Sequence, residues 1–474
     1  MHVIDVDDYR PPPGRLFALT PTAAMLSAAA RAPATGDPLS ANEEFHLAAA
    51  LQRPQARSWL ACAFDLPFRA DPAVLRDGLT TFARCHPTLR TGLRTGPDGR
   101  AERFAVPADA PGFTIAEVGG AQTPDGLRKR LTALLDRACR PLAWPSYAFA
   151  AVLREAGTTV VCGFDHCHTD AHSLAIAAEE LTGILTAPTR PRGSRPAPAA
   201  DRATRPTDSA SEPGDPDRSR ALEVWERFLA DGDGDLPTFP LPLGTAPGGS
   251  APPRHGDHRR LLDAAGTALL EQHCRQADGT LFTGLLAATA LALRELGAPP
   301  PLRLLVPLHT RQRPQLARAI GWFTTVAPLT LDPAGAATLA AALPAARAAF
   351  RRSRETARLP LAATVTALEG RLRPTGGDLF MLSYLDYRTV GTIGEPPRAR
   401  NPHHISRATA ADTVQLWLSR TRHGLFVRTR HPGTATADRT VARFLHAVHQ
   451  HLTEAIDDIP RTRQPMERPF TAPG

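Results

Sequence analysis

The segment TTVVCGFDHCHTDAHSLAIAAEEL, residues 158–181, combines a strand signal, a helix signal and a group of chemically active side chains. Residues 158–164 are β-branched and apolar over a strand-sized length, which predicts a buried strand. Apolar residues then recur at helical spacing and predict a helix over residues 173–185. The heptapeptide HCHTDAH, residues 166–172, therefore lies in a strand-to-helix turn, where rigid neighbours hold loop side chains in place.

The heptapeptide fits two kinds of chemistry. His166 and Asp170 form a His-x-x-x-Asp pattern, in which one imidazole can move a proton. Alternatively, His166, His168, Asp170 and His172 are all residue types that bind zinc. Their order resembles the His-x-His-x-Asp-His of metallo-β-lactamase-type hydrolases, but Ala171 separates the aspartate from the last histidine.

Composition narrows the function classes. A length of 474 residues predicts two or three domain-sized units, and 42% hydrophobic with 22% charged residues is typical of a globular protein with sizeable cores. The net charge of +8 favours an acidic partner. We expect no nucleic-acid partner, because the chain shows neither an arginine-rich helix nor a stripe of aromatic and basic residues.

The cysteines and the N-terminus indicate a compartment. The six cysteines are scattered and form no Cys-x-x-Cys pair, which is typical of a reducing cytoplasm. The first 19 residues lack the apolar core of a signal peptide, and no apolar run reaches the roughly 18 residues of a membrane span. We therefore expect a cytoplasmic protein without a membrane partner.

The chain divides near its middle. Residues 188–220 are rich in Pro, Arg, Ser and Asp and cannot bury enough apolar surface to become ordered. This composition predicts a flexible linker. It would join an N-terminal lobe, residues 1–187, to a C-terminal lobe, residues 221–474. Both lobes mix strands and helices. The predicted elements are strands at 59–67, 86–94, 302–308 and 324–331, a hairpin over 414–430, and helices at 71–85, 221–230, 280–296 and 438–456.

Three ordered blocks carry a family resemblance. Residues 64–94, with His-x-x-Leu-Arg-Thr from His86, resemble the opening of condensation domains. Residues 165–181 are similar to their His-His-x-x-x-Asp-Gly-x-Ser motif, and residues 311–329 to their Arg-x-Arg-Pro-Glu-Leu and Gly-x-Phe-x-Asn-Thr blocks. The chain departs from the pattern at Asp165, in place of the first histidine, and at Ala171, in place of glycine. It most resembles stand-alone condensation enzymes and polyketide-associated acyltransferases of the chloramphenicol-acetyltransferase-like superfamily.

The resemblance implies an α/β fold of two chloramphenicol-acetyltransferase-like lobes, arranged as a V-shaped pseudo-dimer around a central channel. It implies an acyltransferase of natural-product biosynthesis that forms an ester or an amide. The acyl group would come from the phosphopantetheine thioester of an acyl or peptidyl carrier protein, or from coenzyme A, and pass to a small-molecule alcohol or amine. We expect a monomer that needs no metal and no other cofactor.

The resemblance also implies roles for five residues. His166 is the general base, and the carboxylate of Asp170 pairs with Arg311 of the other lobe to fix the loop. Backbone N–H groups near Ala171 would stabilise an oxyanion. Ser173 matches the motif serine and is expected to start the helix, with a catalytic role as the alternative.

Other nearby residues are expected to be bystanders. Cys167, His168 and His172 fall on variable positions of the family motif, while Trp322 and Phe323 are expected in the core. Two alternatives stay open: a catalytically altered protein that binds a carrier protein, and the zinc-dependent hydrolase.

Overall fold

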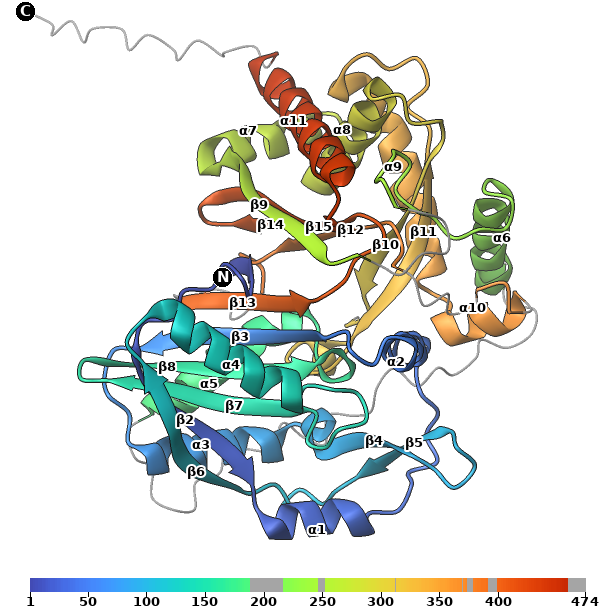
Figure 1. Cartoon of the computed structure of the whole chain (residues 1–474). Coiled ribbons are helices and arrows are strands. Elements are labelled where there is room, and N and C mark those ends of the chain that lie inside the picture. The colour runs from blue at the N-terminus through green and yellow to red at the C-terminus, as the bar shows by residue number, and fades with distance from the viewer. Residues whose placement is uncertain are drawn as a thin grey trace, which may run out of the picture.

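The structure, a computed structural model, describes residues 1–187, 216–245, 252–311, 313–368, 370–372, 378–390 and 399–458. They form two lobes, each a mixed sheet covered by helices (Figure 1). Among the described residues, no helix combines the length and the apolar character that crossing a membrane requires.

The first lobe is built on a seven-stranded sheet. In spatial order its strands are β1 (His2–Asp5), β13 (Arg400–Ala408), β3 (Ser58–Leu66), β8 (Gly157–Asp165), β7 (Tyr147–Arg154), β2 (Gly14–Pro21) and β6 (Phe113–Ala121). Neighbours are antiparallel except β1 and β13, which are parallel. The strand predicted before the heptapeptide is β8, buried along its whole length at the centre of this sheet.

Helices cover both faces of the first sheet because alternate residues of its central strands are apolar on each side. Val160 and Phe164 of β8 pack in one core with α3 and α5, whereas Val161 packs in a second core with α4. The helices of this lobe are α1 (Ala23–Arg31), α2 (Ala41–Gln52), α3 (Pro72–Cys85), α4 (Pro124–Ala138) and α5 (Ala171–Thr186), and a small hairpin pairs β4 (Thr91–Thr95) with β5 (Ala101–Ala105).

The second lobe has a six-stranded sheet. Its order is β11 (Thr324–Leu331), β10 (Leu302–His309), β12 (Met381–Asp386), β14 (Gln415–Thr421), β15 (Gly424–Pro432) and β9 (Arg254–Asp263). The helices α7 (Ala264–Gln276), α8 (Leu281–Glu295), α9 (Leu339–Thr356) and α11 (Ala435–Asp457) form the larger core, while α6 (Pro216–Ala230) and α10 (Leu361–Ala367) contribute to a smaller one. Leu304 and Val306 of β10 face the first core and Leu305 faces the second.

One strand corrects the predicted lobe boundary. β13 belongs to the C-terminal half of the sequence, yet it inserts between β1 and β3 of the first sheet (Figure 1). Its sequence, RNPHHISRA, has one apolar core residue, Ile405, and is otherwise polar or small. The hydrophobic pattern of the sequence therefore does not predict β13 as a strand. Its pairing with β3 joins residues more than 300 positions apart in the sequence, such as Ile405 and Ala61.

Smaller boundaries also differ from prediction. Of the predicted linker, residues 188–215 lie outside the described residues, and residues 216–220 already belong to α6. The strand predicted from residue 86 begins as a short 3-10 helix, Pro87–Arg90, before β4. The remaining predicted strands and helices are confirmed to within a few residues.

Candidate active site

Two aspartates organise the turn between β8 and α5. Asp165 ends β8, and its Oδ1 accepts the Cys167 N–H at 3.0 Å, which starts a short 3-10 helix, His166–His168. Asp170 is the N-cap of α5, and its Oδ1 accepts the Ser173 N–H at 2.8 Å. Capping carboxylates of this kind satisfy amides that have no partner within the helix. The turn is therefore fixed at both ends by a carboxylate.

Asp170 is joined to the second lobe by an arginine. Arg311, just after β10, donates from Nη1 to Oδ2 at 2.8 Å and from Nη2 to Oδ1 at 3.0 Å. The Phe323 N–H, just before β11, donates to Oδ2 at 3.0 Å. Burial raises the pKa of Asp170, but the charge and hydrogen bonds of Arg311 outweigh it and hold the pKa below its usual value. The pair predicted from the resemblance is present as a buried bridge between lobes.

The structure places Ser173 and Ala171 in the first turn of α5. Ser173 is the third residue of α5, so the prediction that it starts the helix is wrong. Its hydroxyl donates to the Gly321 carbonyl at 2.9 Å and accepts from Arg311 at 2.7 Å, which adds a second tie to the other lobe. Ala171 is the first helical residue and does not have a positive φ, so this turn has no need of glycine.

A cavity of about 740 Å³ lies between the lobes next to this turn. It falls within the range of roughly 300–1,000 Å³ typical of small-molecule sites. Its lining includes residues of both sheets, some apolar and some polar. The apolar lining residues include Phe45, Leu305, Leu308, Val326, Phe350, Leu379 and Met381, and the polar ones include Asp378, His404, Ser406, Arg407, Gln415, Arg428 and Arg430.

His166 lines the cavity beneath an aromatic ring. Trp322 lies over the imidazole with ring centroids 4.0 Å apart and planes inclined by 33°. Nδ1 of His166 is shut off from solvent, which leaves Nε2 to face the cavity. Burial lowers the pKa of His166 to about 4, and the nearby charge of His46 adds to this effect. The imidazole is therefore neutral at pH 7. Trp322 was predicted as core and instead covers this histidine, whereas Phe323 is buried as predicted.

A second histidine, which sequence reasoning missed, lies at the same cavity. His46 of α2 is 3.0 Å from Oδ2 of Asp165 through its Nε2, and its ring centroid is 6.2 Å from that of His166. Asp165 is completely buried. The unusual aspartate at this motif position therefore has a partner 119 residues earlier in the sequence. The only signal in the sequence was the departure from the family pattern at Asp165.

The four residues of the zinc hypothesis do not converge. Asp170 is held by Arg311, and His168 Nε2 lies 3.0 Å from the Thr91 carbonyl oxygen. Among the described residues, His46, Asp165 and Cys167 lie together instead, with potential ligand atoms within 4.8 Å of one another. Both oxygens of Asp165 already accept hydrogen bonds there, and burial raises the pKa of the Cys167 thiol well above its usual value. We interpret this group as a hydrogen-bonded cluster.

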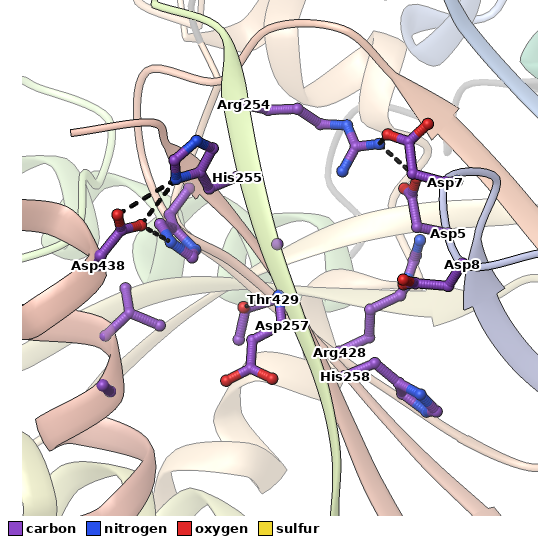
Figure 2. A pocket seen from close by; sticks show the side chains of 14 residues that line it. Asp5, Asp7, Asp8, Arg254, His255, Asp257, His258, Arg428, Thr429 and Asp438 are labelled. Atoms are coloured by element: carbon purple, nitrogen blue, oxygen red, sulfur yellow. Dashed lines mark hydrogen bonds and ion pairs between the residues drawn. The ribbon is translucent and has the colours of Figure 1, made fainter. Parts of the chain in front are cut away.

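A second, polar pocket of about 400 Å³ lies among the N-terminal segment, β9, β15 and α11 (Figure 2), and it shares Asp5, Arg428 and Thr429 with the lining of the larger cavity. Several of its charged side chains pair with one another: Arg254 with Asp5 and Asp7, and Asp438 with His255 at 2.9 Å and His431 at 3.1 Å. It contains none of the residues of the turn. The pocket supplies useful control residues rather than a second candidate site.

Two mixed sheets enclose this cavity, with a histidine at a strand-to-helix turn on its wall, and this arrangement fits an acyltransferase of the chloramphenicol-acetyltransferase-like class. The profile of the Condensation domain family matches residues 49–372, and the chain belongs to this family.

Known relatives agree with this class. "Acyltransferase PapA3" of Mycobacterium tuberculosis is 25% identical over 467 residues, covering 95% of this chain and 96% of the relative. "Trehalose-2-sulfate acyltransferase PapA2" of the same species is 27% identical over 254 residues, covering 52% and 53%. Among solved structures, "PapA2 acyl transferase" has a TM-score of 0.80 at 22% identity, covering 96% of this chain and all of that one. The first condensation domain of the CDA synthetase has a TM-score of 0.64 at 17% identity, covering 89% and 98%. The predicted two-lobed α/β fold is confirmed.

Proposed function

We propose that this acyltransferase moves an acyl group from a carrier-protein or coenzyme A thioester to the hydroxyl or amine of a small molecule, with His166 as general base. The observation that carries the proposal is the neutral imidazole of His166 on a cavity lined by both lobes. A base must be unprotonated before attack and must reach the substrate, and a neutral His166 on the wall of the cavity supports both.

The reaction requires one proton transfer in each direction. As the acceptor oxygen or nitrogen attacks the thioester carbonyl carbon, its proton passes to His166 and the carbonyl becomes an oxyanion. When the C–S bond breaks, the thiolate takes the proton back from His166, and ester or amide and free thiol leave. Positioned general-base catalysis of this kind contributes about 10²–10⁴-fold.

The rest of the turn supports this chemistry. Ala171 and His172 line the cavity at the N-terminus of α5, where backbone N–H groups lack partners within the helix and the helix dipole favours negative charge. These amides are suited to the oxyanion. Asp170 has no role in proton transfer here, because its oxygens are engaged by Arg311, Ser173 and Phe323.

The lining of the cavity suits both substrates. Its apolar residues suit an acyl chain, and its polar residues suit an acceptor with hydroxyl groups. The relatives named above include a trehalose-2-sulfate acyltransferase, which supports an alcohol acceptor. The phosphopantetheine arm of an acidic carrier protein is compatible with the net charge of +8. We further propose a cytoplasmic monomer; its six cysteines are free thiols.

The test is a product screen with the purified protein. It is mixed with acyl-loaded carrier proteins, or with acyl-coenzyme A, and a panel of sugars, alcohols and amines, and products are identified by mass spectrometry. We expect ester or amide products that disappear with His166→Ala. Carrier-protein binding without transfer to any acceptor would instead support the catalytically altered alternative.

A further inference from the structure

His46 faces the cavity with one nitrogen and the protein interior with the other. Nε2 is bound to Asp165 at 3.0 Å. Nδ1 has no hydrogen-bond partner among the described residues, and it is not closed off from the cavity in the way that Nδ1 of His166 is. A donor left free at the wall of a substrate cavity is available to a substrate atom.

The charges around His46 favour its protonated form. Asp165 faces it from the end of β8, and Glu43 lies one turn earlier on its own helix, where it also pairs with Arg103 of β5 at 3.0 Å. The other titratable groups nearby are His166 and Cys167, and the pKa of the Cys167 thiol is raised well above its usual value by burial, so neither adds a negative charge at neutral pH. Burial lowers the pKa of His46, but the charge and hydrogen bond of Asp165 outweigh it, so the pKa lies above its usual value.

The surroundings therefore shift the pKa values of the two imidazoles in opposite directions. His166 has a pKa of about 4, whereas that of His46 is raised. When neighbouring titratable groups have their pKa values pushed apart, one is suited to act as a base and the other as an acid or cation. Their ring centroids are 6.2 Å apart, and Trp322 touches both, with centroid distances of 4.0 Å to His166 and 5.9 Å to His46.

We propose that His46 is a second catalytic residue of this enzyme: its imidazolium donates the free Nδ1–H to the oxyanion that forms as the acceptor attacks the thioester. Asp165 is then a positioning residue that holds His46 charged and oriented. The inference rests on the proposed acyl transfer and adds a cation to its transition state.

The step leaves His46 unchanged. The acceptor's proton goes to His166, the new bond to the carbonyl carbon forms, and the carbonyl electron pair moves to oxygen beside the His46 N–H. On collapse the pair returns to the carbonyl, the C–S bond breaks, and His166 protonates the thiolate. His46 keeps its proton throughout and contributes only a hydrogen bond and positive charge to the oxyanion.

The test compares three variants over pH 4–9 in the transfer assay. His46→Gln can keep a bond to Asp165 through its amide but offers no N–H at the Nδ1 position. Asp165→Asn keeps the shape but removes the charge that favours the imidazolium. Asp438→Asn is the matched control, since it removes a carboxylate from a histidine pair in the polar pocket of Figure 2.

We expect wild-type kcat to fall at alkaline pH as His46 loses its proton. His46→Gln should lower kcat by about 10²–10³-fold, the usual cost of losing one oxyanion donor, with acceptor KM changed less than about threefold. Asp165→Asn should move the alkaline limb to lower pH, and Asp438→Asn should match the wild type. If His46→Gln keeps wild-type kcat while His166→Ala loses it, the role of His46 is refuted and the proposed function stands.

A titration of the histidine resonances by NMR provides a readout that needs no turnover. His46 should titrate above the usual 6.5 in the wild type and lower in Asp165→Asn. A His46 that titrates below 6.5 in the folded wild-type protein would overturn the inference, whether or not a substrate has been found.

Discussion

The two ends of the β8–α5 turn hold buried aspartates that differ in their partners. Asp165 and Asp170 both cap a helical segment, and both have a pKa held below the usual value despite burial. Asp170 is paired with Arg311, which stays charged at every physiological pH, and this pair joins the two lobes. Asp165 is paired with His46, a titratable residue whose pKa is raised by this pairing and which lines the cavity. The permanent charge of an arginine suits an ion pair that holds two lobes together. A histidine that can gain or lose a proton suits a role in catalysis.

The largest effect should come from breaking the fixed pair. Arg311→Ala leaves the Asp170 carboxylate buried without its counter-charge, which costs about 3–5 kcal/mol. Urea unfolding should show this loss. Arg53→Ala is the control, because its pair with Asp412 at 2.7 Å is partly exposed and should cost about 1 kcal/mol or less. Equal losses in the two variants would contradict a structural role for the Asp170 bridge.

Neutralising each aspartate sharpens the comparison. Asp170→Asn leaves Arg311 charged and buried, so its cost should again be about 3–5 kcal/mol. Asp165→Asn allows His46 to become neutral and keep a hydrogen bond, so its cost should be about 1–2 kcal/mol. The free energies of unfolding at pH 7 test this order. A larger loss of stability for Asp165→Asn than for Asp170→Asn would contradict the view that the Asp170 pair is the structural one.

The two pairs should also differ in their dependence on pH. The stabilisation from a lowered carboxylate pKa is present above about pH 3.9 and lost on acidification, while that from the raised pKa of His46 is present below about pH 6.5 and lost as pH rises through its folded value. The cost of Asp165→Asn should therefore be greatest between these limits and shrink at pH 9. The cost of Asp170→Asn should persist at pH 9, because Arg311 remains charged. The measurement is the free energy of unfolding of each variant at several pH values. If the costs of Asp165→Asn and Asp170→Asn change with pH in the same way, the two pairs do not differ as assigned here.

The smallest effect should come from removing metal. The zinc hypothesis needs His166, His168, Asp170 and His172 together, and the structure keeps them apart. Dialysis against a chelator should leave transfer unchanged, and metal analysis of the purified protein should find far less than one zinc per chain. Stoichiometric zinc that is lost with His166→Ala would favour the hydrolase alternative.

Local patterns in the sequence predicted much of the fold. The apolar run before Asp165 became β8, and the apolar spacing after the heptapeptide became α5. Strands such as β13 were missed because their stability comes from partners far away in sequence rather than from their own hydrophobic pattern.

The candidate site was predictable to the extent that it is local or belongs to a motif. The pairing of Asp170 with Arg311 followed from a family resemblance at both residues. His46 was not predictable, because it lies on a helix with no motif of its own, and only the fold brings it to Asp165. The helix-starting role assigned to Ser173 was wrong because Asp170 provides the cap three residues earlier.

The most direct test of the central claim is single-turnover acyl transfer from a loaded thioester by the wild type and by His166→Ala. His255→Ala, an imidazole removed from the polar pocket of Figure 2, serves as the control. The proposed general base predicts that His166→Ala slows transfer by about 10²–10⁴-fold with an unchanged unfolding midpoint, while His255→Ala transfers at the wild-type rate. Transfer by a folded His166→Ala protein within about threefold of the wild type would contradict it.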